Sequence, residues 1–299
     1  MRTLIPATAA VGAAAIGYAA LIERNWFALR RFEVPVLPPG TGPLRVLHIS
    51  DAHLTPGRKR LMSWLRSLDD LNPDLVVNTG DSISHPQSLP CFLDALGPLL
   101  DRPGVFVLGS NDLYAPEPRN PTRYLAGPSS RRKIRKGPDL PWEKLCEDLT
   151  TAGWLDLDNQ RGRLCAGGLD IALAGVHDSH IKRDRYDQVA GQADPAADLR
   201  IGVMHSPEPR LLDQFAADGY DLLLAGHTHG GQLCLPFFGA LVTNCGIDRK
   251  RVRGLHRHPL DGQAWLHVSG GLGTSPWAPA RFACRPEASL LTLVPRDPG

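Results

Sequence analysis

The chain has 299 residues, a formal net charge of +2 at pH 7 and 42% hydrophobic residues. So small a charge gives no support to a nucleic-acid-binding protein, and the length leaves room for one large domain after about 40 N-terminal residues. Six widely spaced cysteines without a Cys-x-x-Cys pair exclude a zinc knuckle and a small disulfide framework. These are Cys91, Cys146, Cys165, Cys234, Cys245 and Cys284.

The N-terminal segment 4–22 contains no charged residue. It just reaches the roughly 20 residues that span a bilayer, although its alanine and glycine content weakens insertion. We favour a signal anchor or weak transmembrane helix; a cleaved signal peptide and a helix packed on the domain are the alternatives. Arg24, Arg30 and Arg31 follow the segment and only Arg2 precedes it, so the positive-inside rule favours a cytoplasmic catalytic domain by a small margin.

The chain divides into three parts on this basis. Residues 1–33 form the hydrophobic anchor or signal segment with its juxtamembrane stretch. Residues 34–43 are rich in proline and glycine, which predicts a linker. Residues 44–299 form the main domain.

Strands and helices alternate in the first half of that domain. Apolar runs predict strands over 44–50, 75–79 and 105–108, and helical spacing of leucines predicts helices over 60–71 and 89–100. This alternation is typical of a parallel sheet with covering helices. Ligands of such sheets bind beyond the carboxyl ends of the strands.

Polar residues able to bind metal follow five of the apolar runs directly. They are Asp51-x-His53, Gly80-Asp81, Gly109-Ser110-Asn111-Asp112, His205 and Gly226-His227-Thr228-His229. In extended backbone, residues two positions apart project to one side, so Asp51 and His53 would point the same way. Carboxylate, imidazole and amide ligands that converge on one rim can surround two divalent cations, which points to metal-assisted phosphoester hydrolysis.

These motifs resemble those of the calcineurin-like metallophosphoesterases over roughly residues 44–294. Two further groups of residues resemble one branch of this family, which has an N-terminal anchor or export signal and is close to lipid-linked pyrophosphate hydrolases. They are Gly226–Gln232 with Leu235-Pro236, and Gly271–Ser275 with Arg281-Phe282 and Pro286-Glu287. The resemblance implies an α/β fold, a four-layer α/β/β/α sandwich of two mixed sheets with an N-terminal hydrophobic helix. Strands at 169–174, 265–269 and 289–294 would form the second sheet.

The resemblance also implies two metal positions that share the carboxylate of Asp81. One position would take Asp51, His53, Asp81 and His229, and the other Asp81, Asn111, His205 and His227. Such ligands suit Mn, Fe, Zn or Co better than Mg. A hydroxide bridging the two ions would attack the phosphorus in line.

The third motif departs from the family pattern Gly-Asn-His-Asp or Glu. Either Asn111 is the ligand after a one-residue slip, which we favour, or Ser110 stands at the ligand position and Asn111 replaces the histidine. The customary catalytic histidine is missing in both alignments. Asp112 could take its place, but a carboxyl beside two dications should be ionised and a poor acid.

His180 and His85 are the candidate substitutes for the missing histidine, although for each of them we favour an ordinary loop residue. A good leaving group would remove the need for an acid. The sequence therefore favours activated phosphodiesters or pyrophosphates over alkyl phosphomonoesters.

Two basic runs, 119–136 and 249–257, lie outside the ligand motifs. They are either solvated loops or surfaces for anionic lipid headgroups or a phosphate-bearing substrate. Prolines around the first run indicate an inserted loop, a candidate cap over the site. Arg119, Arg123 and Trp277 are the predicted substrate contacts.

The sequence thus predicts a membrane-associated enzyme with two divalent metal ions that hydrolyses a phosphodiester or pyrophosphate. Its expected partners are a phosphoester substrate and membrane lipid, with no specific nucleic acid. A phosphomonoesterase or phosphoprotein phosphatase, a nuclease and a catalytically weakened metal-dependent binding module remain as alternatives. Neither the native metals nor the oligomeric state follows from the sequence.

Overall fold

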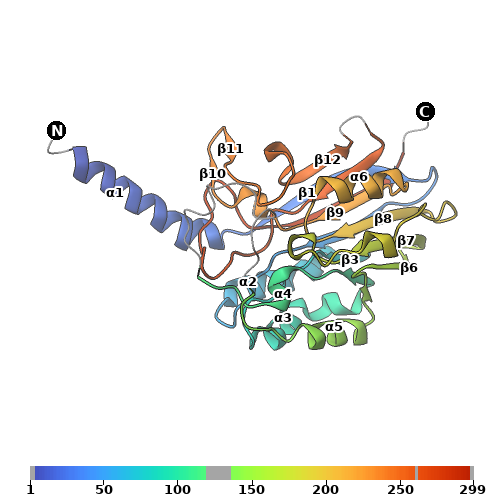
Figure 1. Cartoon of the computed structure of the whole chain (residues 1–299), viewed down its shortest axis with the longest axis horizontal. Helices are drawn as coiled ribbons and strands as arrows, with labels where there is room; N and C mark the ends of the chain where they lie inside the picture. Colours follow the sequence, from blue (N-terminus) through green and yellow to red (C-terminus); the bar gives the residue numbers. More distant parts are fainter. Residues whose placement is uncertain (1–3, 119–135, 260–261, 297–299) are drawn as a thin grey trace.

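The computed structural model describes residues 4–118, 136–259 and 262–296 (Figure 1). For residues 4–9 it describes the backbone alone. Two six-stranded sheets form its body, together with a small two-stranded ribbon. The sequence prediction of an α/β fold with two mixed sheets is confirmed.

The first sheet has parallel pairings throughout except at one antiparallel junction, where β14 meets β2. In spatial order its strands are β1 (Ala28–Leu37), β14 (Glu287–Pro295), β2 (Leu44–Ile49), β3 (Leu75–Asn78), β4 (Gly104–Phe106) and β5 (Leu155–Asp156). Strands β2 to β5 run in one direction, so their carboxyl ends share one edge of the sheet.

The second sheet has a parallel centre with an antiparallel strand at each edge. In spatial order its strands are β12 (Gly254–His258), β13 (Ala264–Val268), β9 (Leu222–Ala225), β8 (Leu199–Met204), β7 (Leu169–Val176) and β6 (Gln160–Ala166). The small ribbon consists of β10 (Cys234–Leu235) and β11 (Gly239–Ala240).

Hydrophobic side chains alternate along the strands and bury both faces of the sheets. In β2, Leu47 and Ile49 face a core shared with helices, whereas Val46 faces the core between the two sheets. A third core lies between the second sheet and α6, where Phe215 is fully buried. The helices are α1 (Leu4–Gly17), α2 (Lys59–Ser67), α3 (Ser88–Leu96), α4 (Ser110–Leu113), α5 (Trp142–Thr151) and α6 (Pro209–Ala217).

Two sequence predictions about the ends of the chain are wrong. Residues 34–37 of the predicted linker belong to strand β1, which pairs in parallel with β14. Proline at position 35 is compatible with this strand because β1 lies at the edge of its sheet. The strand predicted at 289–294 for the second sheet is β14 of the first sheet. The six cysteines are free thiols, and all but Cys165 are buried or half-buried.

The N-terminal segment consists of α1, which extends away from the body in Figure 1, and a short turn of helix over 18–25 that docks on the domain. The buried carboxylate of Glu23 accepts hydrogen bonds from the backbone N–H groups of Ala283 and Cys284, at 3.0 and 2.6 Å. The N–H of Arg281 donates to the carbonyl of Ala19. Within the described residues, no helix is both long and apolar enough to cross a bilayer, so the predicted span is not confirmed.

Candidate metal centre

The predicted ligands come from both sheets and meet where the sheets face each other. Asp51 follows β2, Asp81 follows β3 and Asn111 lies in α4 after β4, all from the first sheet. His205 and His227 follow β8 and β9 of the second sheet. The sequence prediction of a single rim is therefore wrong in this detail, because two parallel edges contribute.

Five of the predicted ligands have left-handed backbone conformations. Their φ angles are 53° for Asp51, 42° for His53, 55° for Asp81, 68° for His227 and 51° for His229. This finding corrects the expectation of extended backbone in the two D-x-H and H-x-H motifs. Positive φ is uncommon outside glycine and costs on the order of 1–3 kcal/mol per residue, and such strain gathers at functional sites.

Two glycines of the motifs allow this crowding. Gly80 has φ of +91°, a conformation that side chains rarely adopt, and an added Cβ would lie 2.4 Å from the backbone nitrogen of Gly109. At Gly226, an added Cβ would lie 1.9 Å from the hydroxyl of Ser50 and 2.7 Å from the carboxylate of Asp51. Glycine is therefore needed at both positions for close approach of the loops.

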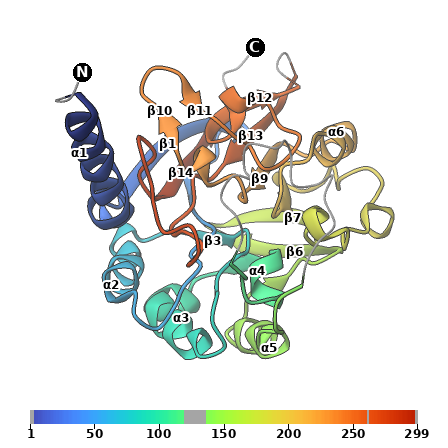
Figure 2. The same cartoon turned by 60° about the vertical axis from the view of Figure 1, so that its left-hand side comes forward.

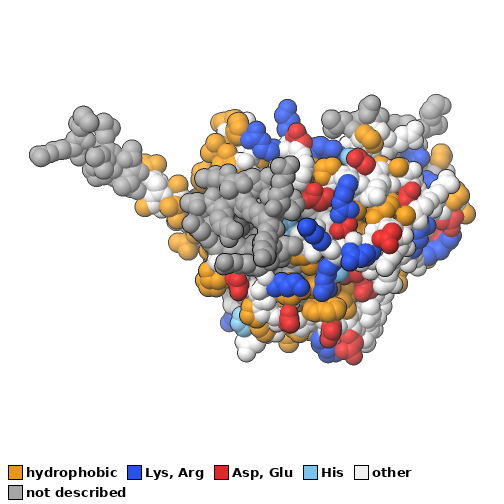
Figure 3. Space-filling view, in the orientation of Figure 1, with side chains coloured by type: hydrophobic (Ala, Val, Ile, Leu, Met, Phe, Trp, Pro, Cys, Tyr) orange, Lys and Arg blue, Asp and Glu red, His pale blue; other side chains and the backbone are white. Residues whose placement is uncertain are grey.

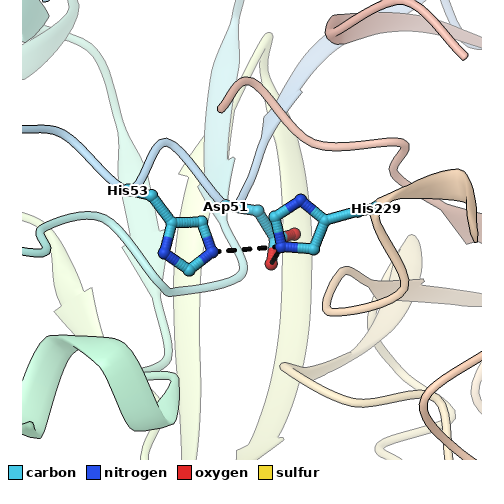
Figure 4. A group of neighbouring side chains, drawn as sticks. All are labelled: Asp51, His53 and His229. Atoms are coloured by element: carbon cyan, nitrogen blue, oxygen red, sulfur yellow. Dashed lines mark hydrogen bonds and ion pairs between the residues drawn. The ribbon is translucent and has the colours of Figure 1, made fainter. Parts of the chain in front are cut away.

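The first group of ligand atoms belongs to Asp51, His53 and His229, all buried (Figure 4). The Nε2 atoms of His53 and His229 lie 3.0 Å apart. Nε2 of His229 is also 3.5 Å from Oδ1 of Asp51. The three side chains point toward one common position.

The second group contains Asp51, Asp81 and His205, with His227 beside it. One oxygen of Asp81, Oδ2, lies 3.4 Å from Nε2 of His53 and 3.6 Å from Nε2 of His205. Nδ1 of His227 lies 3.3 Å from Nε2 of His205. The carboxylate of Asp81 therefore stands between the two groups, where the sequence analysis expected a bridging ligand.

Surrounding polar groups hold the ligand rings in place. Nδ1 of His53 contacts the hydroxyl of Ser84 at 3.0 Å, and Nδ1 of His205 contacts the carbonyl of Thr79 at 2.6 Å. Such contacts fix the ring orientation of metal-binding histidines and leave the other nitrogen facing the site.

Burial sets the protonation of most of these histidines. It lowers the pKa of His53 to about 4 and the pKa values of His227 and His229 well below the usual range. These rings are therefore neutral at pH 7 and keep a lone pair for a metal.

The remaining ligands show an excess of negative charge. Although burial acts against it, the charges of Asp81, Asp178 and Asp51 raise the pKa of His205 to about 10. Burial raises the pKa of Asp51 to about 6. At pH 7 the proton on His205 supplies positive charge that bound cations would otherwise supply.

The residues present therefore fit divalent metal ions. Carboxylate oxygens and neutral imidazole nitrogens converge within bonding range of common positions, without side chains between them. Nε2 of His227 is buried and has no hydrogen-bond partner among the described residues. Imidazole and carboxylate are common ligands of divalent transition metals, and the choice among Mn, Fe, Zn and Co stays a prediction.

Asn111 lies against the central carboxylate. Its backbone N–H and its side-chain amide each donate to Asp81, both at 2.7 Å. The neighbouring Ser110 is half-buried at the start of α4. Asn111 is therefore brought to the site, and the choice between Asn111 and Ser110 as the ligand stays a prediction.

Asp112 is buried and faces backbone instead of the site. Its two oxygens accept hydrogen bonds from four N–H groups, those of Asp81, Ser82, Ile83 and Gly109. Burial and the charge of Asp81 raise its pKa to about 7. With both oxygens engaged, Asp112 ties the second motif to the third, and its predicted role as a proton donor finds no support in this geometry.

His180 is the better placed of the two candidate acids. Its ring centroid lies 4.9 Å from that of His227, and the ring is half-buried. His85 is exposed, and its Nδ1 accepts a hydrogen bond from the N–H of Gln87 in a local turn.

The predicted substrate contacts fall partly outside the described residues. Arg119 and Arg123, with the rest of the run 119–135, belong to the part that is not described. Trp277 is 56% exposed, and its indole N–H donates to the carbonyl of Pro116 at 2.6 Å. In the second basic run, the guanidinium of Arg257 packs 3.7 Å from the ring centroid of Trp265.

Two residues near the centre had no role in the sequence analysis. Arg281 is fully buried, and its guanidinium donates to the carbonyls of His229 and Gly270 and approaches Nδ1 of His229 at 3.2 Å. Asp178 is buried in the loop after β7, close enough to raise the pKa of His205. The strand-end rule that found His205 would also have found Asp178, whereas nothing in the sequence marks Arg281 as buried.

The chain is similar in sequence to known proteins. The family described as calcineurin-like phosphoesterase matches residues 44–231. Phosphodiesterase YaeI of Escherichia coli (strain K12) is 28% identical over 98% of this chain and 98% of its own length. UDP-2,3-diacylglucosamine pyrophosphatase LpxG of Chlamydia trachomatis is 28% identical over 84% of each chain. The crystal structure of TT1561 of Thermus thermophilus superposes with a TM-score of 0.42 at 10% identity, over 77% of this chain and 90% of that one.

Proposed function

The chain belongs to the calcineurin-like phosphoesterase family and is a hydrolase, and on this premise we propose that two divalent metal ions in its centre promote hydrolysis of a phosphodiester or pyrophosphate bond. The observation that carries the proposal is the position of the Asp81 carboxylate, between His53 of one ligand group and His205 of the other. A shared carboxylate is what a dinuclear centre requires.

Two sets of ligands would hold the ions. The first set is Asp51, His53, Asp81 and His229, and the second is Asp81, Asn111, His205 and His227. When bound, the ions would lower the pKa of the attacking water and neutralise charge on the phosphoryl oxygens.

The protein's own groups would set the geometry around the reacting phosphate. Asp112 holds the loop of Asp81 against the loop of Asn111 through four backbone hydrogen bonds. Arg281 holds the backbone of His229 by donating a hydrogen bond to its carbonyl. A ligand set held in advance avoids reorganisation during the reaction.

The leaving group decides which substrates such a site can turn over. Asn111 carries an amide that does not titrate, so it cannot replace the missing histidine as an acid. His180, beside His227, is the proposed source of a proton where one is needed. A pyrophosphate or an aryl phosphodiester needs none, because its leaving group is already stable as an anion.

The proposed substrate is membrane-associated. LpxG, by its name, acts on a pyrophosphate with two acyl chains, and this chain resembles it over most of its length. Apolar side chains also lie exposed on the N-terminal segment and on the β10–β11 ribbon, among them Leu21 and Phe237. The division into an N-terminal anchor and a catalytic domain is part of this proposal.

Hydrolysis assays on the full chain test the proposal. The protein would be freed of metal, reloaded with Mn and given a bis-aryl phosphodiester and an aryl phosphomonoester. We expect metal-dependent cleavage of the diester and a loss of about a hundredfold in Asn111→Ala, with Ser110→Ala as the matched control.

Each other outcome has its own meaning. Equal turnover of both esters would favour a phosphomonoesterase. Loss in Ser110→Ala with activity kept in Asn111→Ala would move the ligand role to Ser110. Two bound metals per chain without turnover of either ester would indicate a binding module.

A further inference from the structure

A basic cavity lies where the N-terminal segment meets helix α2. Its volume is about 240 Å³, and its lining consists of Asn25 from the segment and residues 57–60 at the start of α2. Figure 2 shows α2 directly beside the domain end of α1. Three of the lining residues are positively charged, namely Arg58, Lys59 and Arg60.

The cations of this cavity have no anionic partner among the residues that the structure describes. Nη2 of Arg58 and Nε of the adjacent Arg24 are buried and make no hydrogen bond. Guanidinium groups removed from water without a partner are unfavourable, because their desolvation is not compensated. Burial and the charges of Arg24 and Arg281 lower the pKa of Arg58 to about 10, in agreement with repulsion among these cations.

The backbone adds to the positive potential. Helix α2 begins at Lys59, and no side chain forms a hydrogen bond to its first turn, which also contains no acidic residue. The free N–H groups and the helix dipole at this end attract anions. The unpaired guanidinium and the helix start therefore point to the same kind of ligand.

Exposed apolar side chains stand next to the cavity on the same segment. Leu21 is 72% exposed, Ile22 57% and Trp26 53%. Figure 3 shows hydrophobic side chains at the α1 end of the molecule and on the ribbon above it. A phosphate site bordered by apolar side chains and a tryptophan matches the boundary between headgroups and acyl chains.

We propose that this cavity binds the phosphate of an anionic phospholipid headgroup, with Leu21, Ile22 and Trp26 in the adjacent acyl layer. Arginine forks pair with phosphate oxygens through two parallel hydrogen bonds, which a lysine cannot reproduce. The loop that carries Asp51 and His53 leads directly into residues 57–60, so the docked lipid surface would lie beside the metal centre. The inference deepens the membrane part of the proposed function and rests on that part alone.

Binding of the full chain to vesicles tests the inference. The phospholipids are themselves phosphodiesters, so a metal chelator is kept in the buffer to prevent hydrolysis and make the result independent of it. Vesicles of phosphatidylcholine are compared with vesicles that also contain phosphatidylglycerol, and the readout is the gain in affinity caused by the anionic lipid. We expect Arg58→Gln to reduce this gain about fivefold or more. Arg58→Lys should lose most of it too, although its charge is kept.

The matched control is Arg210→Gln, an exposed arginine of α6 at the far end from α1 in Figure 1, and it should change the gain less than twofold. Thermal unfolding of each variant checks that it is folded. Two results together would refute the site: Arg58→Lys binds anionic vesicles as well as the natural protein, and Arg58→Gln loses no more affinity than Arg210→Gln. Diffuse positive charge would then explain the binding.

A titration with inorganic phosphate distinguishes a lipid headgroup from a soluble phosphate as the ligand of the cavity. Phosphate should stabilise the natural protein weakly, should not stabilise Arg58→Gln, and should compete with vesicles that contain phosphatidylglycerol. Phosphate binding that depends on Arg58, together with vesicle binding that neither Arg58 variant changes, would assign the cavity to a soluble phosphate and overturn the lipid proposal.

Discussion

The metal centre and the cavity at Arg58 are opposite in charge but share one property. Each holds charged groups that are withdrawn from water and that the described residues do not fully neutralise. These are the buried carboxylates of Asp51 and Asp81 and the half-buried guanidiniums of Arg24 and Arg58. In the centre, a proton on His205 partly offsets the charge. The comparison teaches that a charge withdrawn from water without a partner indicates a ligand of the opposite charge.

Removal of the shared carboxylate should have the largest effect. Asp81→Asn takes one charged ligand from both proposed metal positions, and several kcal/mol of transition-state stabilisation depend on those ions. We expect a loss of about a thousandfold in kcat and fewer than two metals per chain. The exposed Asp187→Asn is the control, and metal content by mass spectrometry is the second readout. Two bound metals in Asp81→Asn would contradict the shared role.

Removal of the metals should have the next largest effect. Only the folded protein brings all the ligands together, so bound metal stabilises the folded state. At a free metal concentration of a hundred times Kd, binding stabilises a protein by about 2.7 kcal/mol. Chelation should therefore lower Tm by about 5 °C, measured by calorimetry, and Mn should restore it. An unchanged Tm would mean that the carboxylates and His205 already balance each other.

Arg281→Lys should weaken the centre without removing a ligand. Lysine keeps the positive charge but cannot reach all the carbonyls that the guanidinium holds, those of His229 and Gly270 among them. Loss of such a supporting contact reduces metal affinity about 10- to 100-fold. Competition with a chromophoric chelator measures the affinity. A lower Tm with normal metal affinity would instead assign Arg281 a purely structural role.

Arg58→Gln should have the smallest effect on stability, and the direction of the change in Tm is the informative result. Loss of an unpaired, partly buried cation should leave Tm in phosphate-free buffer unchanged or raise it by about 2 °C. Arg102→Gln provides the contrast, because Arg102 is paired with Asp69 at 2.8 Å and its loss should lower Tm slightly. A clear drop in Tm for Arg58→Gln would show that the guanidinium has a stabilising partner.

The sequence predicted which polar side chains the structure brings together, because these residues follow hydrophobic strands directly. Asp51, Asp81 and His205 each stand one to three residues beyond a buried strand, and the ends of parallel strands coincide in space. The left-handed backbone of these residues was not predicted, because φ depends on how two loops crowd together, as at Gly226.

The basic cavity could not be predicted from the sequence. Arg24 and Arg58 belong to no common periodic pattern, and they meet only because Glu23 docks the N-terminal segment on the loop at Ala283. The sequence also could not predict to which sheet β14 belongs. Strands of both sheets are apolar on both faces, so composition does not tell which neighbour a late strand chooses.

The position of β14 between β1 and β2 has a consequence for folding during synthesis. Strand β1 is made first, yet its hydrogen-bonding neighbour is the strand that ends at Pro295, so the first sheet stays incomplete until nearly the whole chain has left the ribosome. Contacts between segments this distant form slowly, and the open edge of β2 can pair with other chains meanwhile. An N-terminal segment that reaches a lipid surface early would keep such unfinished chains apart.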